Sequence, residues 1–362
     1  MQKDGGRMAA NYLERYVYQY GDKTFTQMPP NVVDDLIFAM LAYLDYDRLP
    51  AGMHRLADLA GEETVQAAVS ARAWAPEKYG QLLRALALSP RFSGVRWHRH
   101  RERLDDIAME QFGAVTLEWA PQTYFLAYRG TNSTVAGWKE DLNMGYQPAV
   151  PAQRAAVRYL RETRAALPGR YMIGGHSKGG NLAVYAALHS APALTEDLVQ
   201  IFNFDGPGFL PDPVADKRYD ALAARITKLV PTGSVVGLLL EHHQDYAVVA
   251  SDSVSFWQHD PFNWRIHGTD FEYRPQTDAA AQFTQATFTA WLDGLSTAER
   301  AAILASLFTV ADAGQADTMA ELRHLTPDRV RAFYHAARTL PTESRAVWKK
   351  SAHSLWHALR WK

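Results

Sequence analysis

One short stretch of the chain, residues 175–179, reads G-H-S-K-G and fits the pattern G-x-S-x-G. This pattern presents a serine nucleophile on a sharp turn between a strand and a helix. The turn is strained, and side chains at the flanking positions, Gly175 and Gly179, would clash there. Ser177 is therefore predicted to be a nucleophile, whereas His176 is expected to pack beside the turn in a structural role.

The same turn does not fit a phosphate-binding loop. A Walker loop reads G-x-x-x-x-G-K-[ST], but Lys178 precedes two glycines and no hydroxyl residue follows it. The dinucleotide pattern G-x-G-x-x-G also fails, because the glycines have the wrong spacing. We expect no cofactor, and we expect no metal site because no cluster of His, Asp and Glu has the spacing of metal ligands.

A serine hydroxyl is a weak nucleophile and needs a base, usually a histidine that a carboxylate orients. Where this turn carries a catalytic serine, the chain order is serine, acid, histidine. His259 is the favoured base because it follows a strand-like segment, residues 253–257, after which a loop would return to the active face. His242 and His243 are the alternative, although they also fit a polar loop, and His189 comes too early in the chain.

The acid is expected to be Asp205, which follows a buried strand-like segment, residues 198–204. Ligand-binding groups of an open α/β sheet lie at this carboxyl end of the strands. A second interpretation is a turn aspartate that accepts hydrogen bonds from neighbouring backbone amides. The next strand carries no carboxylate at its end, so Ser234 is a candidate for the alternative acid position. The other candidates for the acid are Asp252 and Asp260.

An oxyanion hole needs backbone amides close to the nucleophile. One amide is expected from Lys178, the residue after the serine. The other is expected from residues 129–134, RGTNST, where Thr131 could add its hydroxyl. A simple turn at the end of a strand is the other interpretation of this segment.

The segments around these residues alternate between strand and helix. Two β-rich segments, residues 112–119 and 124–128, flank Pro121-Gln122 and predict a hairpin. Helices are expected at 152–167 and 181–189, strands at 171–174, 198–204 and 226–230, and further strands or strand ends at 246–250 and 253–257. This order predicts an α/β architecture with a mostly parallel sheet.

Both ends of the chain are predicted to be helical. Residues 32–44 have helical apolar spacing with acids near the start, where the helix dipole favours them. After about residue 275 no strand signal occurs, and a capping-box pattern opens at Ser296. We therefore expect an α/β domain with N-terminal helices in residues 1–275 and a C-terminal helical region in residues 276–362.

The composition excludes several classes of protein. The formal net charge is −1, so no basic field indicates a nucleic-acid partner. Cysteine is absent, which excludes disulfides and thiolate metal sites and suits a cytoplasmic protein. The first residues have no apolar segment typical of a signal peptide, and no apolar run is long enough for a transmembrane helix.

Six motifs occur in a consistent order: YRGT, GWKEDLNM, GGHSKGGNLAVYAA, NFDGPGF, VPTGSVVGLLLEH and QHDPFNW. Together, over roughly residues 10–270, they resemble the maternal-embryonic-gene-like (Mbeg-like) family of mostly bacterial proteins, which is related to the class 3 lipases. The resemblance implies an α/β-hydrolase fold, with Ser177 as nucleophile and Lys178 and Thr131 at the oxyanion positions. The lipase acid normally precedes Val-Pro, where this chain has Lys228-Leu229, so Asp205 is the substitute. The lipase histidine matches His259 by order alone.

These residues predict a serine hydrolase of the esterase or lipase type, which cleaves a small-molecule or lipid acyl ester through a Ser177 acyl-enzyme. The alternative, favoured by the missing acid at the usual place, is a non-catalytic relative that binds a partner. Residues 235–240, VVGLLL, suit an acyl pocket or a plain core equally. Residues 347–362 mix tryptophans with basic residues and could touch a membrane surface, although an amphipathic helix packed on the core is the favoured interpretation.

Overall fold

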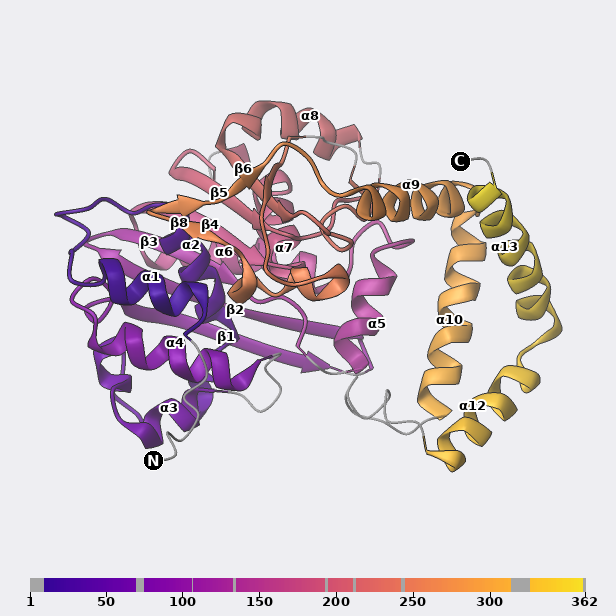
Figure 1. Cartoon of the computed structure of the whole chain (residues 1–362), viewed down its shortest axis with the longest axis horizontal. Coiled ribbons are helices and arrows are strands. Elements are labelled where there is room, and N and C mark those ends of the chain that lie inside the picture. The colour runs from indigo at the N-terminus through magenta and orange to yellow at the C-terminus, as the bar shows by residue number, and fades with distance from the viewer. Residues whose placement is uncertain are drawn as a thin grey trace, which may run out of the picture.

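An eight-stranded sheet forms the centre of the protein in the computed structural model (Figure 1). The structure describes residues 10–69, 75–105, 107–132, 135–192, 195–210, 213–241, 245–313 and 326–360. In spatial order the strands are β1 (Arg96–Asp105), β2 (Glu110–Ala120), β3 (Thr123–Tyr128), β4 (Arg170–His176), β5 (Leu198–Phe204), β6 (Ile226–Pro231), β7 (Ala247–Val249) and β10 (Tyr273–Arg274).

Strands β3 to β7 pair in parallel, whereas β1, β2 and β10 pair antiparallel at the two sides of the sheet. The hairpin of β2 and β3 lies where the sequence predicts it. The predicted α/β fold with a mostly parallel central sheet is therefore confirmed. A separate short hairpin pairs β8 (Ile266–His267) with β9 (Asp270–Phe271).

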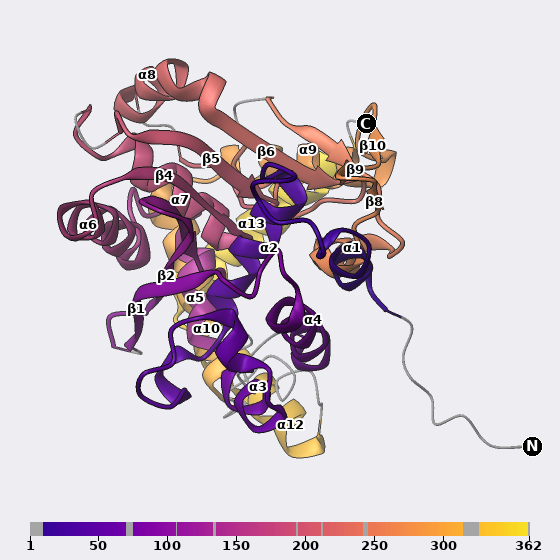
Figure 2. The same ribbon diagram turned by 90° about the vertical axis from the view of Figure 1, so that its left-hand side faces the viewer.

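Helices cover both faces of the sheet, so the α/β part has three layers (Figure 2). Phe125 and Leu126, neighbours in β3, point to opposite faces and join different apolar clusters. The cluster of Phe125 contains side chains of α1 (Tyr12–Tyr20), α2 (Val32–Met40), α3 (Glu62–Ala68) and α4 (Pro76–Leu88). The cluster of Leu126 contains side chains of α6 (Pro151–Ala166), α7 (Lys178–Leu188) and α8 (Pro213–Leu222).

Two features of the sheet region differ from the sequence prediction. Strand β1 was not predicted, because its charged sequence RWHRHRERLD lacks an apolar face; such a sequence suits an edge strand, where charges discourage further pairing. The prediction of a strand at residues 253–257 was wrong, because a 3-10 helix, Ser255–His259, follows β7 instead. The outer edge of β7 is already paired with β10, so it offers no edge to another strand.

The described residues after 278 are helical apart from short connections. The helices are α9 (Ala279–Asp293), α10 (Thr297–Ala313), α12 (Pro327–Thr339) and α13 (Thr342–Arg360). They extend to one side of the sheet, and α10 reaches α5 (Val135–Asn143) through an ion pair of 2.6 Å between Lys139 and Asp312 (Figure 1). The division of the chain near residue 275 stays a prediction.

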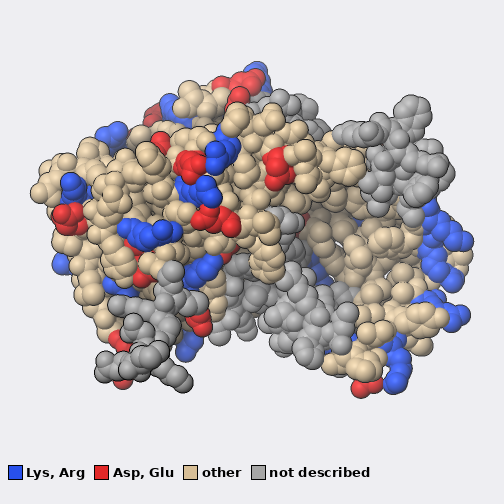
Figure 3. All heavy atoms as spheres, viewed as in Figure 1, with Lys and Arg blue, Asp and Glu red and all other residues tan. Residues whose placement is uncertain are grey.

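The last helix, α13, packs against its helical neighbours. The Trp291 indole Nε1–H donates to Ser351 Oγ at 2.9 Å, and Lys350 pairs with Glu299 at 2.5 Å. Lysine and arginine side chains gather on the outer edge of this region (Figure 3). Ser351 and Lys350 of α13 thus contact α9 and the start of α10, whereas the side chains from residue 352 onward lie outside the described part. None of the helices that the structure describes is long and apolar enough to cross a bilayer.

Candidate active site

Ser177 lies between β4 and α7, at the N-cap of the helix. Its backbone has φ 59° and ψ −134°, a conformation that is strained for a residue with a side chain. A Cβ atom at Gly175 would come within 2.4 Å of the Tyr128 carbonyl oxygen, and one at Gly179 within 2.1 Å of the same oxygen. The end of β3 therefore requires both glycines. A serine on such an elbow, at the carboxyl end of a central parallel strand, is the arrangement of an α/β-hydrolase.

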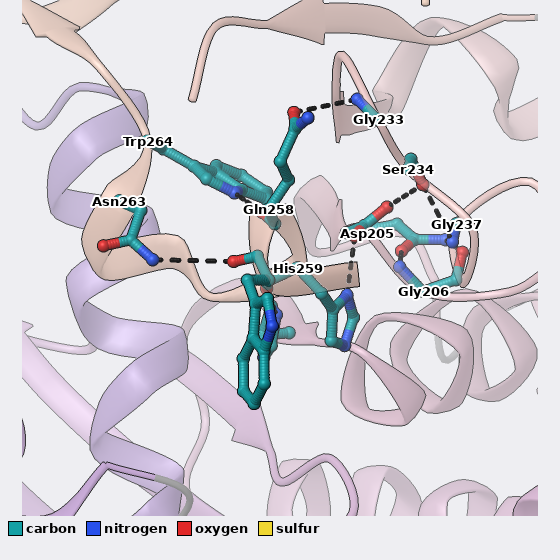
Figure 4. A network of polar contacts seen from close by, with 12 residues as sticks. Asp205, Gly206, Gly233, Ser234, Gly237, Gln258, His259, Asn263 and Trp264 are labelled. Atoms are coloured by element: carbon teal, nitrogen blue, oxygen red, sulfur yellow. Dashed lines mark hydrogen bonds and ion pairs between the residues drawn. The ribbon is translucent and has the colours of Figure 1, made fainter. Parts of the chain in front are cut away.

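Asp205 and His259 contact each other although 54 positions separate them in the chain. The distance from His259 Nδ1 to Asp205 Oδ2 is 2.6 Å (Figure 4). Asp205 directly follows β5 and is fully buried, and its second oxygen, Oδ1, accepts from Ser234 Oγ at 2.5 Å. Both oxygens of the carboxylate are therefore held in place. Ser234, weighed as the acid itself, is a partner of the acid candidate.

The backbone around His259 is anchored by its neighbour, Gln258. The Gln258 Oε1 atom accepts from the Gly233 N–H at 2.8 Å and from Thr232 Oγ1 at 2.9 Å. The Trp264 indole donates to the Gln258 carbonyl at 2.8 Å (Figure 4). These bonds tie the segment before His259 to the end of β6, and so they direct the imidazole toward Asp205.

His176 also supports this segment from inside the elbow. Its Nε2 lies 2.8 Å from the His259 carbonyl oxygen, and its Nδ1 lies 3.2 Å from the Tyr43 hydroxyl. Burial, together with the neighbouring His259, holds the pKa of His176 well below its ordinary value, so the ring is neutral. A carbonyl can only accept, so Nε2 carries the proton and Nδ1 accepts from Tyr43. His176 thus positions the backbone of His259.

The two other aspartates weighed as the acid have different partners. Asp260 lies 2.6 Å from the Lys78 ammonium, and its Oδ1 accepts from the Phe262 N–H at 3.1 Å. Asp252 lies at the surface and pairs with Arg265 at 2.5 Å. Of the carboxylates weighed, Asp205 is the one that contacts His259.

His189 stands at the end of α7, where its Nδ1 lies 3.1 Å from the Tyr185 carbonyl oxygen. The structure does not bring it into the Asp205 and His259 arrangement. His242 and His243 lie outside the described residues. Within the described part of the chain, no group of three or more His, Asp and Glu residues is placed to hold a metal ion.

Thr131 and Lys178, the two predicted oxyanion residues, line the same cavity as Ser177. The Thr131 hydroxyl donates to Asp141, so the backbone amides are the groups left to serve an oxyanion. The Lys178 side chain turns into the protein, where its ammonium lies 2.8 Å from Glu140 Oε2 and 3.3 Å from Asp141 Oδ1. Lys178 thereby ties the turn after Ser177 to α5.

The charges of this buried cluster depend on one another. Burial acts to lower the pKa of Lys178, but the carboxylates of Asp141 and Glu140 outweigh it and raise that pKa. Burial raises the pKa of the Asp141 carboxyl, although Lys178 and Thr131 act against this effect. This cluster was not predicted from the sequence. The signal was a lysine within an otherwise small and apolar helix start, since a buried lysine needs an anionic partner.

Replacing Lys178 by methionine is expected to lower the free energy of unfolding by about 3–5 kcal/mol, because Glu140 and Asp141 are left without their buried counter-charge. Urea unfolding followed by circular dichroism measures the change. The double variant Lys178→Met/Glu140→Gln, which also removes one carboxylate, should recover part of the loss. A single variant as stable as the wild type would contradict the ion-pair assignment.

The cavity has a volume of about 310 Å³, and both Ser177 and His259 line it. The apolar run at residues 235–240 has two roles, because Val236 and Leu239 line the cavity whereas Leu238 is buried in the core. Lys228 donates to the Gly237 carbonyl at 2.7 Å and pairs with Glu241. It therefore anchors this run.

A family model described as Mbeg1-like matches residues 86–309. No curated protein matches the chain in sequence. Among solved structures, the chain is similar to a Rhizomucor miehei lipase propeptide complex, with 15% identity and a TM-score of 0.35 over 53% of this chain and 66% of that chain. The match therefore spans just under two thirds of that lipase.

Two further lipase structures are similar at comparable levels. Lip2 lipase from Yarrowia lipolytica has 10% identity and a TM-score of 0.34, and the match covers 51% of this chain and 72% of that chain. Lipase from Rhizopus microsporus var. chinensis has 16% identity and a TM-score of 0.34, and the match covers 66% of this chain and 89% of that chain.

Proposed function

The chain belongs to the Mbeg1-like family, and we propose that it is a serine hydrolase of the esterase or lipase type that cleaves an acyl ester. One observation carries the proposal: Asp205 holds the His259 imidazole by a 2.6 Å contact, on a cavity that Ser177 also lines. A buried carboxylate, an imidazole and a serine on a strained elbow are the groups that acyl transfer needs.

In the proposed reaction, Ser177 Oγ attacks the ester carbonyl carbon while His259 Nε2 takes the hydroxyl proton. Asp205 holds Nδ1–H and stabilises the imidazolium that forms. The backbone amides of Lys178 and Thr131 donate to the oxyanion of the tetrahedral intermediate. His259 then returns the proton to the departing alcohol, leaving an acyl ester on Ser177. A water molecule, deprotonated by His259, hydrolyses this ester and releases the acid.

The proposed substrate is a small-molecule or lipid ester, and the reaction needs no cofactor. A cytoplasmic location also belongs to the proposal, because a chain without cysteine suits a reducing compartment. Peripheral contact of the C-terminal helix with a membrane surface stays a proposal too, supported by the basic outer edge of that region (Figure 3).

Labelling with a fluorophosphonate probe tests the proposal. The probe reacts with an activated serine hydroxyl, so we expect stoichiometric labelling of the wild-type protein at Ser177, located by peptide mass spectrometry. The Ser177→Ala variant and heat-denatured wild-type protein are expected to stay unlabelled. If folded wild-type protein does not react, the hydrolase proposal fails, and a relative that only binds ligands in this cavity becomes the better interpretation.

A further inference from the structure

Two helices of the C-terminal region, α9 and α10, complete the cavity that Ser177 and His259 line. These helices and the connection between them contribute largely apolar side chains, among them Phe288, Trp291, Leu295, Ile303, Leu304 and Leu307. Leu295 and Ile303 are nearly inaccessible to solvent, although empty volume lies beside them. The reactive groups stand on the α/β domain, whereas this apolar wall comes from helices outside the sheet.

Among its described residues, the wall carries one charged side chain, and that side chain is held by backbone carbonyls. Arg300 is the charged residue that α9 and α10 place along the cavity within the described part of the chain. Its Nη2 and Nε donate to the Leu292 carbonyl at 2.7 and 3.1 Å, and its Nη1 donates to the Gly145 carbonyl at 3.3 Å. Arg300 therefore joins the end of α9 to the segment after α5. A sugar, a peptide or a phosphate would lose its water against the apolar side chains of this wall without regaining hydrogen bonds from them.

The wall is held in place before any ligand binds. The Trp291 indole donates to Ser351 on α13, and Glu299 at the start of α10 pairs with Lys350. These contacts fix both helices from the side away from the sheet. A preformed apolar wall favours binding because little conformational entropy is lost when a ligand enters.

The cavity reaches the surface. Leu307 on α10 and Leu142 on α5 both line it, and each is 40% exposed. Each of these apolar side chains therefore belongs both to the cavity and to the surface. The volume of about 310 Å³ is at the lower end of the range of roughly 300–1,000 Å³ for small-molecule sites, so it suits one chain rather than several.

We propose that α9 and α10 form the binding site for a single unbranched apolar acyl chain of the substrate, so that the C-terminal helices select esters by chain length. This inference rests on the proposed function and deepens it. A buried methylene group contributes roughly a fourfold gain in kcat/KM when its transfer from water is expressed only in the transition state. The wild-type protein should therefore prefer octanoyl and dodecanoyl esters to acetyl esters.

The test compares p-nitrophenyl acetate, butanoate, octanoate and dodecanoate, with each rate divided by the fraction of Ser177 that a small fluorophosphonate labels. Leu304→Trp fills the cavity from α10, and Ala305→Trp places the same side chain on the exposed face of that helix. Leu304→Trp is expected to lower kcat/KM for dodecanoate about tenfold or more, with acetate changed less than about twofold. Ala305→Trp should leave kcat/KM unchanged for all four esters.

Leu304→Ala tests the same site if the larger side chain of Leu304→Trp prevents folding. It widens the cavity, and it is expected to move the preferred ester toward longer chains. Titration calorimetry of sodium dodecanoate with the same proteins reports the chain site without catalysis, and Leu304→Trp should weaken this binding about tenfold or more.

The outcomes separate the two proposals. The acyl-chain site is wrong if Ser177 is labelled but kcat/KM is the same for all four esters. It is also wrong if Leu304→Trp and Leu304→Ala both leave the dependence of kcat/KM on chain length unchanged. In either case the proposal of hydrolase activity is still supported. If Ser177 is not labelled, the proposal of hydrolase activity is wrong, and the dodecanoate titration alone decides whether α9 and α10 bind an apolar chain. In that case, a dissociation constant for dodecanoate that Leu304→Trp does not change would contradict the proposed chain site.

Discussion

Replacing His259 by alanine is expected to lower kcat for a p-nitrophenyl ester about 10⁴- to 10⁶-fold, because Ser177 then has no base to take its proton. The substitution should leave the fold intact. Gln258 anchors the neighbouring backbone through Gly233 and Thr232, and His176 contacts the His259 carbonyl rather than its ring nitrogens. The substitution should therefore lower kcat and change KM little.

His189→Ala is the matched control, since it removes a histidine from the end of α7 without touching the Asp205 contact. Its kcat is expected to stay within about twofold of the wild type, because His189 has no proposed role in proton transfer. Added imidazole should restore part of the activity of His259→Ala, since the deletion leaves room for a small base. A His259→Ala variant that keeps a tenth of the wild-type rate would place the base elsewhere.

The fold and the strained turn that carries Ser177 could be predicted because their signals are local. The G-x-S-x-G turn requires small residues within two positions of Ser177, and the alternation of apolar strands with amphipathic helices indicates a parallel sheet. The strand at residues 198–204 was predicted with its observed ends. Each of these inferences depends on neighbours in sequence and not on a distant partner.

The partners of Asp205 and Lys178 depend on the tertiary structure. Sequence placed Asp205 at the right end of the sheet, but its contact with His259 depends on a long segment that returns after β7. From the sequence, Lys178 was expected to contribute only its backbone amide to an oxyanion hole. Its contact with Glu140 could not be predicted, because no local pattern shows that α5 packs beside the turn. The prediction that these residues are catalytic still awaits experiment.

The strand predicted at residues 253–257 failed for a related reason. Its residues are β-prone, yet a strand needs an edge with which to pair, and β10 occupies the edge of β7. Helices α9 and α10 were expected from their sequence pattern. That pattern predicts a buried face but not the surface against which the face packs. Only the structure shows that these helices line the Ser177 cavity.

Replacing Asp205 by asparagine is expected to lower kcat about 10⁴-fold while KM changes little. Asparagine has nearly the same shape and can still accept from Ser234 at its amide oxygen. Its amide NH₂ would donate to His259 Nδ1, so the neutral imidazole would carry its proton on Nε2. A protonated Nε2 cannot accept from Ser177, and the base is lost although the ring stays in place. Steady-state kinetics and a thermal melt measure the two effects separately.

Asp260→Asn is the informative comparison, because Asp260 is the direct neighbour of His259 in the chain and is also largely buried. Its carboxylate pairs with Lys78 at 2.6 Å, so its loss should lower stability while kcat stays within about threefold of the wild type. A large loss of kcat in Asp260→Asn with normal turnover in Asp205→Asn would transfer the acid role to Asp260. The opposite result would place the acid at the end of β5, directly after Phe204.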